Sequence, residues 1–83
     1  MDKEIKDCSI EELLDAGKSI LLCPENREVF YCGLNIRYDH SHTDEWFVSF
    51  IHIKETILEE HNKNLKDALV ALFNRAWPIM RTM

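Results

Sequence analysis

Two strand-forming segments joined by a short polar loop constrain this 83-residue chain more than any other feature of its sequence. In the segment 28–38 the even positions from Phe30 onward are apolar, which is the period-two alternation of a strand with one buried face. A second run of strong strand formers covers residues 46–53. Residues 39–44 are polar, so the sequence predicts an antiparallel hairpin closed by this loop.

A symmetric closure of the loop places Tyr38 opposite Glu45, and this register sorts the hairpin side chains onto two faces. One face is almost wholly apolar and is predicted to pack against a helix; its members are Phe30, Cys32, Leu34, Ile36, Phe47, Ile51 and Ile53. The other face mixes aromatic and polar side chains. The division of the sheet into core and surface therefore depends on this register.

The segments before the hairpin predict a short helix and one more strand. Ser9 followed by Glu12 fits a capping box that opens an amphipathic helix over residues 9–16. Residues 19–23 are largely apolar and are followed by turn-forming residues 24–27, which favours a strand paired with the first hairpin strand.

The C-terminal part carries the clearest helical period in the chain. From Asn64 onward, apolar residues recur at steps of three and four. Pro78 cannot continue a regular helix, so the helix is predicted to end near Trp77. The expected fold is a single α+β domain over residues 1–83, in the order αβββα. It has a three-stranded antiparallel sheet packed by the C-terminal helix, with a short N-terminal helix.

Composition disfavours several classes of function. Ten basic residues against 15 acidic ones give a net charge of −5, which is unfavourable for binding phosphate backbones or anionic membranes. No apolar run is long enough to span a bilayer. The three cysteines have neither disulfide-framework nor metal-ligand spacing. We expect a cytoplasmic protein with reduced thiols, no cofactor and no membrane contact.

No set of residues predicts catalysis or metal binding. His40 and His42 are metal-ligand types, but they lie in the polar loop and no third ligand has a fixed spacing to them. The predicted register sends Cys32 and His52 to opposite faces, so a thiol beside a base is not expected. The paired acidic residues lie in solvated contexts. The sequence therefore predicts that the protein is not an enzyme and holds no metal.

An αβββα order is shared by double-stranded RNA-binding domains, which this chain resembles in topology. Those domains place lysines at the start of the last helix, where this chain has Lys63 and Lys66. With Arg75 and Arg81 these residues form an alternative nucleic-acid surface. The net charge of −5 disfavours phosphate binding by this surface.

A strand with a tryptophan, residues 46–53, is followed by the helical segment Asp-Ala-Leu-Val-Ala-Leu-Phe-Asn-Arg-Ala-Trp at residues 67–77. In this pattern the C-terminal half resembles small phage and prophage accessory proteins of the ABA-sandwich type. The resemblance implies a small host-directed binding protein. Inhibitors of bacterial defence systems, such as anti-CRISPR proteins, are one group of this kind.

The mixed face of the predicted sheet is the candidate partner-binding site, composed of Tyr31, Arg37, Trp46, Phe50 and His52. Trp, Tyr and Arg are enriched at binding hot spots. The alternative is that the helix over residues 9–16 covers this face, which gives a helix–sheet–helix sandwich. We expect a non-catalytic module that binds a host protein or a second copy of itself as a homodimer, with the acidic residues offering complementarity to a basic partner.

Overall fold

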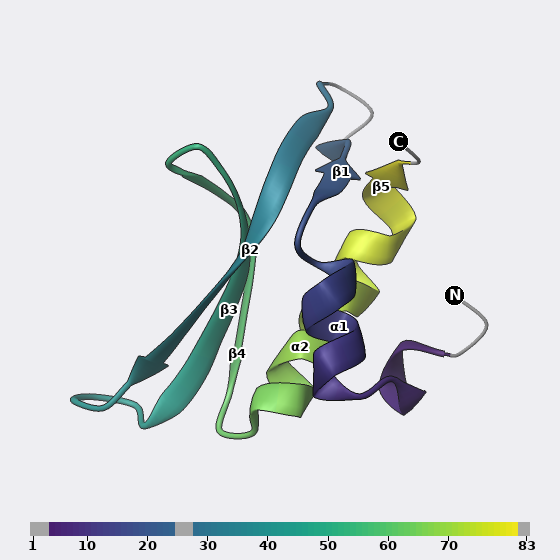
Figure 1. The fold of residues 1–83 in the computed structure, drawn as a ribbon. Coiled ribbons are helices and arrows are strands. Elements are labelled where there is room, and N and C mark those ends of the chain that lie inside the picture. The colour runs from purple at the N-terminus through teal and green to yellow at the C-terminus, as the bar shows by residue number, and fades with distance from the viewer. Residues whose placement is uncertain (1–3, 25–27, 82–83) are drawn as a thin grey trace.

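The computed structural model describes residues 4–24 and 28–81, which form helices and strands around one antiparallel sheet (Figure 1). Their order is η1 (Ile5–Asp7), α1 (Ile10–Ala16), β1 (Ile20–Leu22), β2 (Phe30–Asp39), β3 (Glu45–His52), β4 (Glu55–Asn62), α2 (Leu65–Ala76), η3 (Trp77–Ile79) and β5 (Met80–Arg81). The strand order across the sheet is β4-β3-β2-β1-β5. The α+β class is confirmed, whereas the prediction of three strands is wrong because the described residues form five. Residues 25–27 of the predicted turn lie outside the described residues.

Both helices begin and end where the capping residues predict. Ser9 accepts a hydrogen bond from the Glu12 amide while the Glu12 side chain accepts one from the Ser9 amide, so the capping box is present. Asn64 caps α2 by accepting from the Asp67 amide. Regular α-helix then ends at Ala76, two residues before Pro78. These local signals act within one turn of chain, which is why the sequence alone locates them.

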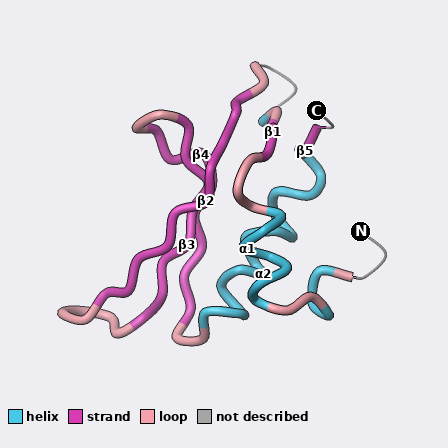
Figure 2. The backbone as a smooth tube through the Cα atoms, in the orientation of Figure 1, coloured by secondary structure: helices cyan, strands magenta, loops and turns pink. Residues whose placement is uncertain are grey.

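The two helices cover the same face of the sheet (Figure 2). Phe50 of β3 packs edge-on against Phe73 of α2, with ring centroids 5.4 Å apart. Leu34 is the cross-strand partner of Phe50, and a Cβ atom added to Gly17 at the end of α1 would lie only 3.1 Å from Cδ2 of Leu34. The predicted alternative of a helix–sheet–helix sandwich is therefore wrong. The face turned away from α1 and α2 is called the open face below.

The β2–β3 register differs by one residue from the predicted register. Tyr38 lies opposite Trp46, and Asp39 lies opposite Glu45, so β2 ends one residue later and the loop is one residue shorter than expected. The Asp39 carboxylate explains the difference, because it accepts hydrogen bonds from the amides of Ser41 and Thr43 and so fixes the turn directly after Asp39. A one-residue shift sends every side chain of the second strand to the other face.

The core contributed by β3 is therefore the opposite of the predicted one. Val48 and Phe50 are fully buried under the helices. The three positions of the second hairpin segment predicted to be core are not: Phe47 and Ile51 of β3 are half-buried on the open face, and Ile53, in the turn after β3, is 83% exposed. On β2 the predicted parity holds, since Cys32 is fully buried and Phe30, Leu34 and Ile36 pack against the core.

Strand β4 has no counterpart in the sequence prediction. It pairs with β3 along the outer edge of the sheet, with a register shift between Phe50 and Ile51. Four of its eight residues are Glu or His, which is typical of an edge strand exposed to water. These residues do not show the alternation of polar and apolar side chains that marks a strand with one buried face. The turn before it is Ile53-Lys54, without the Gly or Asn that marks most two-residue hairpin turns.

A pair of alanine substitutions tests the observed register. We expect Phe50→Ala to lower the free energy of unfolding by about 3–5 kcal/mol, because it empties a fully buried aromatic site. Phe47→Ala removes the same side chain from the open face and should cost about 1 kcal/mol. Urea denaturation of both variants measures the difference. A greater loss for Phe47→Ala would restore the register predicted from the sequence.

Ile53 provides a second test because its backbone is strained. Its φ angle is 59°, and only Asp44 shares a positive φ among the described non-glycine residues. A β-branched residue rarely adopts this conformation, whereas Gly does so freely. Ile53→Gly should therefore raise the free energy of unfolding by about 1 kcal/mol. Lys54→Gly, at the other turn position, is the matched control and should give no gain in the same denaturation experiment.

Candidate binding surface on the open sheet face

The structure divides the five predicted partner-binding residues between the two sides of the sheet. Tyr31 and Arg37 lie on the open face and are exposed, with Tyr31 58% accessible. Trp46, Phe50 and His52 have the parity of the buried face. The prediction for Phe50 is wrong, because this side chain is fully buried against α2. The one-residue change of register is the physical reason in each case.

The His52 side chain connects the end of β3 to β2 through a hydrogen bond. Its Nδ1 lies 2.9 Å from the carbonyl oxygen of Tyr31, and since a carbonyl only accepts, this nitrogen carries the proton. Its ring also packs edge-on against Phe30, with centroids 5.2 Å apart. His52 is therefore occupied within the sheet, in contacts that join two strands.

Three side chains from three neighbouring strands stack on the open face. Arg37 of β2 is paired with Phe47 of β3, which is paired with His61 of β4. The guanidinium carbon of Arg37 lies 4.6 Å from the centre of the Phe47 ring, a cation–π contact. The Phe47 and His61 rings stack with centroids 5.2 Å apart and planes 21° apart. We call Arg37, Phe47 and His61 the cation–aromatic column.

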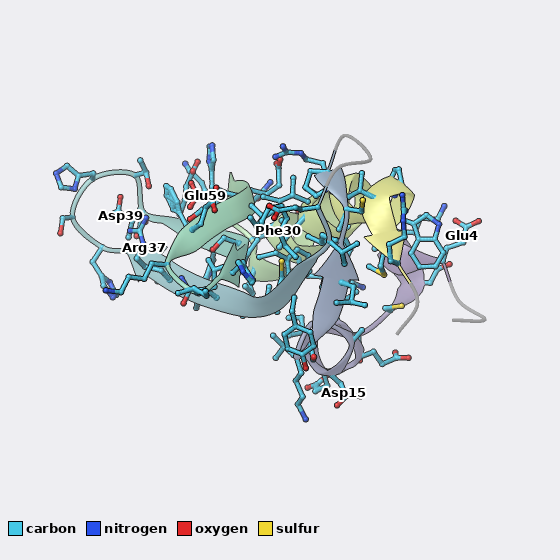
Figure 3. All side chains as sticks on the ribbon, turned by 90° about the horizontal axis from the view of Figure 1, so that it is seen from above. Glu4, Asp15, Phe30, Arg37, Asp39 and Glu59 are labelled. Carbon is cyan, nitrogen blue, oxygen red and sulfur yellow. The ribbon has the colours of Figure 1, made fainter. Side chains whose placement is uncertain are left out.

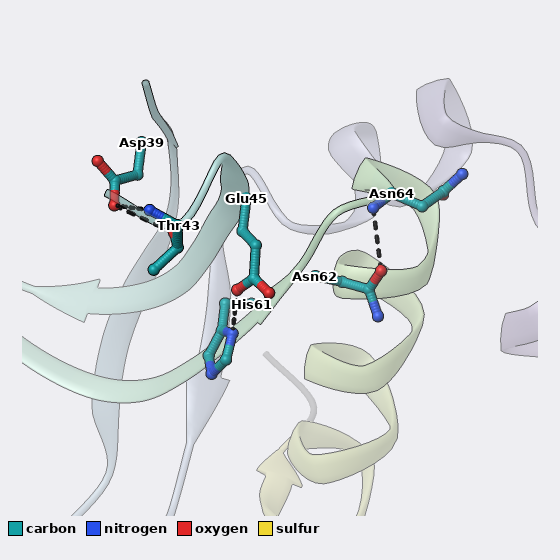
Figure 4. A network of polar contacts seen from close by, with 6 residues as sticks. All are labelled: Asp39, Thr43, Glu45, His61, Asn62 and Asn64. Carbon is teal, nitrogen blue, oxygen red and sulfur yellow. Dashed lines mark hydrogen bonds and ion pairs between the residues drawn. The ribbon is translucent and has the colours of Figure 1, made fainter. Parts of the chain in front are cut away.

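Glu45 anchors the far end of this column. His61 Nδ1 lies 2.6 Å from Glu45 Oε2, a contact drawn in Figure 4. The His61 side chain remains 61% exposed, whereas that of Glu45 is 22% exposed. Arg37 and His61 thus hold the Phe47 ring in place from both sides, while the His61 end of the column stays exposed to solvent. The arrangement presents an aromatic ring and N–H donors in fixed positions.

Sequence reasoning missed Phe47 and His61 for identifiable reasons. Phe47 was assigned to the core by the shifted register, and His61 lies in β4, which was not predicted. The available signal was the position of Asp39 before Ser41 and Thr43, since an aspartate two residues before a turn amide favours an Asx-type turn. That signal fixes the shorter loop and, with it, the face of Phe47.

The tip of the β2–β3 hairpin carries a second aromatic group on the other side of the sheet. Tyr38 packs edge-on against both Trp46 and His40, with ring centroids 4.9 and 4.6 Å away. The Tyr38 hydroxyl donates to the Asp44 carboxylate, and this hydrogen bond is the largest cause of the raised pKa of Tyr38. These contacts hold both ends of the loop together.

Asp39 organises the loop from inside. Besides the Ser41 and Thr43 amides, its carboxylate accepts from the Thr43 hydroxyl at 3.1 Å (Figure 4). Hydrogen bonds from Thr43, led by its backbone amide, lower the pKa of Asp39 from its usual 3.8 to about 2. The described residues contain no group of three or more His, Cys, Asp and Glu side chains suited to a metal ion. His40 and His42 are exposed to solvent.

The cysteines lie inside the molecule. Cys8, Cys23 and Cys32 are all buried, so the predicted place of Cys32 in the core is confirmed. The register correction places Cys32 on the same face as His52, contrary to the prediction that they point apart. Burial raises the pKa of the Cys32 thiol, which disfavours the reactive thiolate.

Arg75, a member of the alternative nucleic-acid surface, contacts β4. Its Nη1 donates to the Glu59 carbonyl oxygen at 2.8 Å and to Glu60 Oε2 at 2.6 Å. Its charge is thus partly neutralised within the molecule.

Among the described residues, no helix combines the length and the apolar character needed to cross a membrane. Comparison with protein-family models, curated proteins and solved structures gives no significant match.

The lowered pKa of Asp39 predicts how stability responds to acid. A carboxylate whose pKa falls on folding stabilises the native state fully above its unfolded pKa and loses this effect as the pH drops. For Asp39 this window runs from its usual 3.8 down to about 2. The melting temperature of Asp39→Asn should be lower than wild type at neutral pH and should approach it through this window.

Glu59→Gln is the matched control for this experiment, because it removes one carboxylate from the open face without touching the loop. Its melting curve should keep the acid dependence of the wild type. Parallel melting curves of wild type and Asp39→Asn between pH 5 and 2 would show that Asp39 does not stabilise the loop as its hydrogen bonds indicate.

Proposed function

We propose that this protein is a non-catalytic binding module whose open sheet face docks on a basic surface of another protein. The observation that carries the proposal is the cation–aromatic column, which lies on a face that neither α1 nor α2 covers. Tyr31 extends the same face toward β1, where its hydroxyl accepts a hydrogen bond from Ser19. Arg and Tyr are among the residue types most enriched at binding hot spots.

Preorganisation supports a binding role for this face. Arginine normally loses much side-chain freedom when it enters an interface. Here the guanidinium already rests on the Phe47 ring, and His61 is already held by Glu45. Docking would therefore immobilise few additional rotamers, and more of the contact energy would appear as affinity.

Charge supports a basic partner. Residues 39–60 contain six acidic residues and one lysine. Figure 3 places Arg37 and Asp39 at the end of the molecule remote from Glu4, with Glu59 on the same sheet. Glu59 is exposed and pairs with Ser49 on the open face. Glu45 and Glu59 would attract a basic protein toward the His61 end of the column and make association sensitive to salt.

The resemblance of residues 46–77 to small phage accessory proteins supports a more specific role. We propose a host-directed inhibitor that acts by contact, as anti-CRISPR-type proteins do. In this role, carboxylates around an aromatic centre would occupy a basic groove that normally receives nucleic acid. The partner is thus a nucleic-acid-binding protein rather than nucleic acid itself.

Affinity capture from a bacterial lysate with single variants tests the proposal. Phe47→Ala and Arg37→Ala should each weaken capture of the same host protein by about tenfold or more, since each removes part of the column. Trp77→Ala is the matched control, because it removes a 55% exposed aromatic side chain from the helical side. Circular dichroism establishes that every variant is folded.

Three results would argue against the proposal. If Trp77→Ala lowered capture of the host protein as much as the column variants do, the binding site would not be the open face. Capture that persists unchanged in high salt would exclude a basic partner. A gel shift of double-stranded RNA at low salt, abolished by alanine at Lys63 and Lys66, would favour the nucleic-acid alternative.

A further inference from the structure

Strand β2 is only partly paired on one of its two edges. β1 pairs with residues 30–32 of β2, and β3 pairs on the opposite edge with residues 33–39. In the described part of the chain, the edge of β2 that continues past β1 therefore has no neighbouring strand at residues 34–39. In Figure 1 this half of β2 extends away from both helices toward the loop at residues 40–44.

The other sheet edges in the described part of the chain are charged or short, and β4 carries three glutamates along its length. On β4, Arg75 binds the Glu59 carbonyl oxygen. On the β3 side of β2, His52 occupies the carbonyl oxygen of Tyr31. β5 is only two residues long. Proteins usually protect edge strands by such short lengths and charged side chains, so the open stretch of β2 stands apart as a template for strand addition.

We propose that a second copy of this chain pairs with residues 34–38 of β2, antiparallel and with a two-fold axis at Ile36. This register puts Ile36 opposite Ile36 and Leu34 opposite Tyr38, so the half-buried apolar side chains meet on one face. On the other face Asn35 lies opposite Arg37 of the second copy. No like charges oppose one another.

Other symmetric registers fit less well. An axis at Arg37 would place the two guanidinium groups opposite each other, which is unfavourable. An axis at Tyr38 would pair Arg37 with Asp39, but the Asp39 carboxylate is occupied by the loop and the paired stretch is shorter. Toward the N-terminal end of β2, the stretch that is free to pair ends at Cys32, because β1 already pairs with that residue. Ile36 is thus the centre that pairs the most residues.

The dimer has a consequence for docking, which rests on the proposed function. A two-fold axis perpendicular to the sheet keeps both open faces on the same side. Two cation–aromatic columns would then face one partner surface, and simultaneous engagement would raise avidity without a new type of contact. The pairing itself is independent of this consequence.

Sedimentation equilibrium over a concentration series tests the pairing with two substitutions at Asn35, which is exposed. With Asn35→Glu, the two-fold axis creates two equivalent pairs in which the new carboxylate lies opposite Arg37 of the other copy. This variant should tighten dimerisation by about tenfold. Asn35→Arg faces the same guanidinium and should weaken it by a similar factor. General repulsion between chains of net charge −5 predicts the reverse order, since Asn35→Arg makes the net charge less negative and Asn35→Glu makes it more negative.

The double variant Asn35→Arg with Arg37→Glu restores opposite charges across the axis and should dimerise at least as tightly as wild type. A wild-type chain that stays monomeric at millimolar concentration would overturn the pairing, as would Asn35→Arg dimerising more tightly than Asn35→Glu. Phe47 lies on β3, outside the paired stretch, so Phe47→Ala should lose capture of the partner of the proposed function and still dimerise like wild type. The two proposals can therefore fail separately.

Discussion

The hydrogen bonds accepted by the Asp39 carboxylate determine the arrangement of the rest of the molecule. They close the loop one residue earlier than symmetric closure would, and so set the pairing of Asp39 with Glu45. That pairing decides which side chains of β3 enter the core. Phe50 then meets Phe73 under α2, and Phe47 is left on the open face between Arg37 and His61.

The sequence predicts those parts of the fold that depend on local interactions. The capping box at Ser9 and the end of the C-terminal helix before Pro78 each depend on residues within a turn of chain, and the structure has both as predicted. Pairing between strands is different, because one residue of loop length reverses a whole strand. The assignment of Phe47, Ile51 and Ile53 to the core was wrong for this reason.

The candidate surface was predicted only in part. Tyr31 and Arg37 lie on β2, whose alternation sets their face regardless of register. Phe47 and His61 could not be found without the correct pairing and without β4. That strand is hard to recognise because Glu59 and His61 are exposed and Glu60 is ion-paired with Arg75 on the other face, so no apolar alternation marks a strand over these residues.

The pairing of β1 with β5 bears on the order in which the sheet can be completed. β2, β3, β4 and α2 follow one another in sequence and in space, so their contacts close short loops that form early. β1 and β5 are separated in sequence by all of these elements, yet Leu22 lies beside Met80. The β1–β5 pairing therefore forms only after two segments distant in sequence have come together. During synthesis on a ribosome, β1 must remain without its second neighbour until the residues after α2 have emerged.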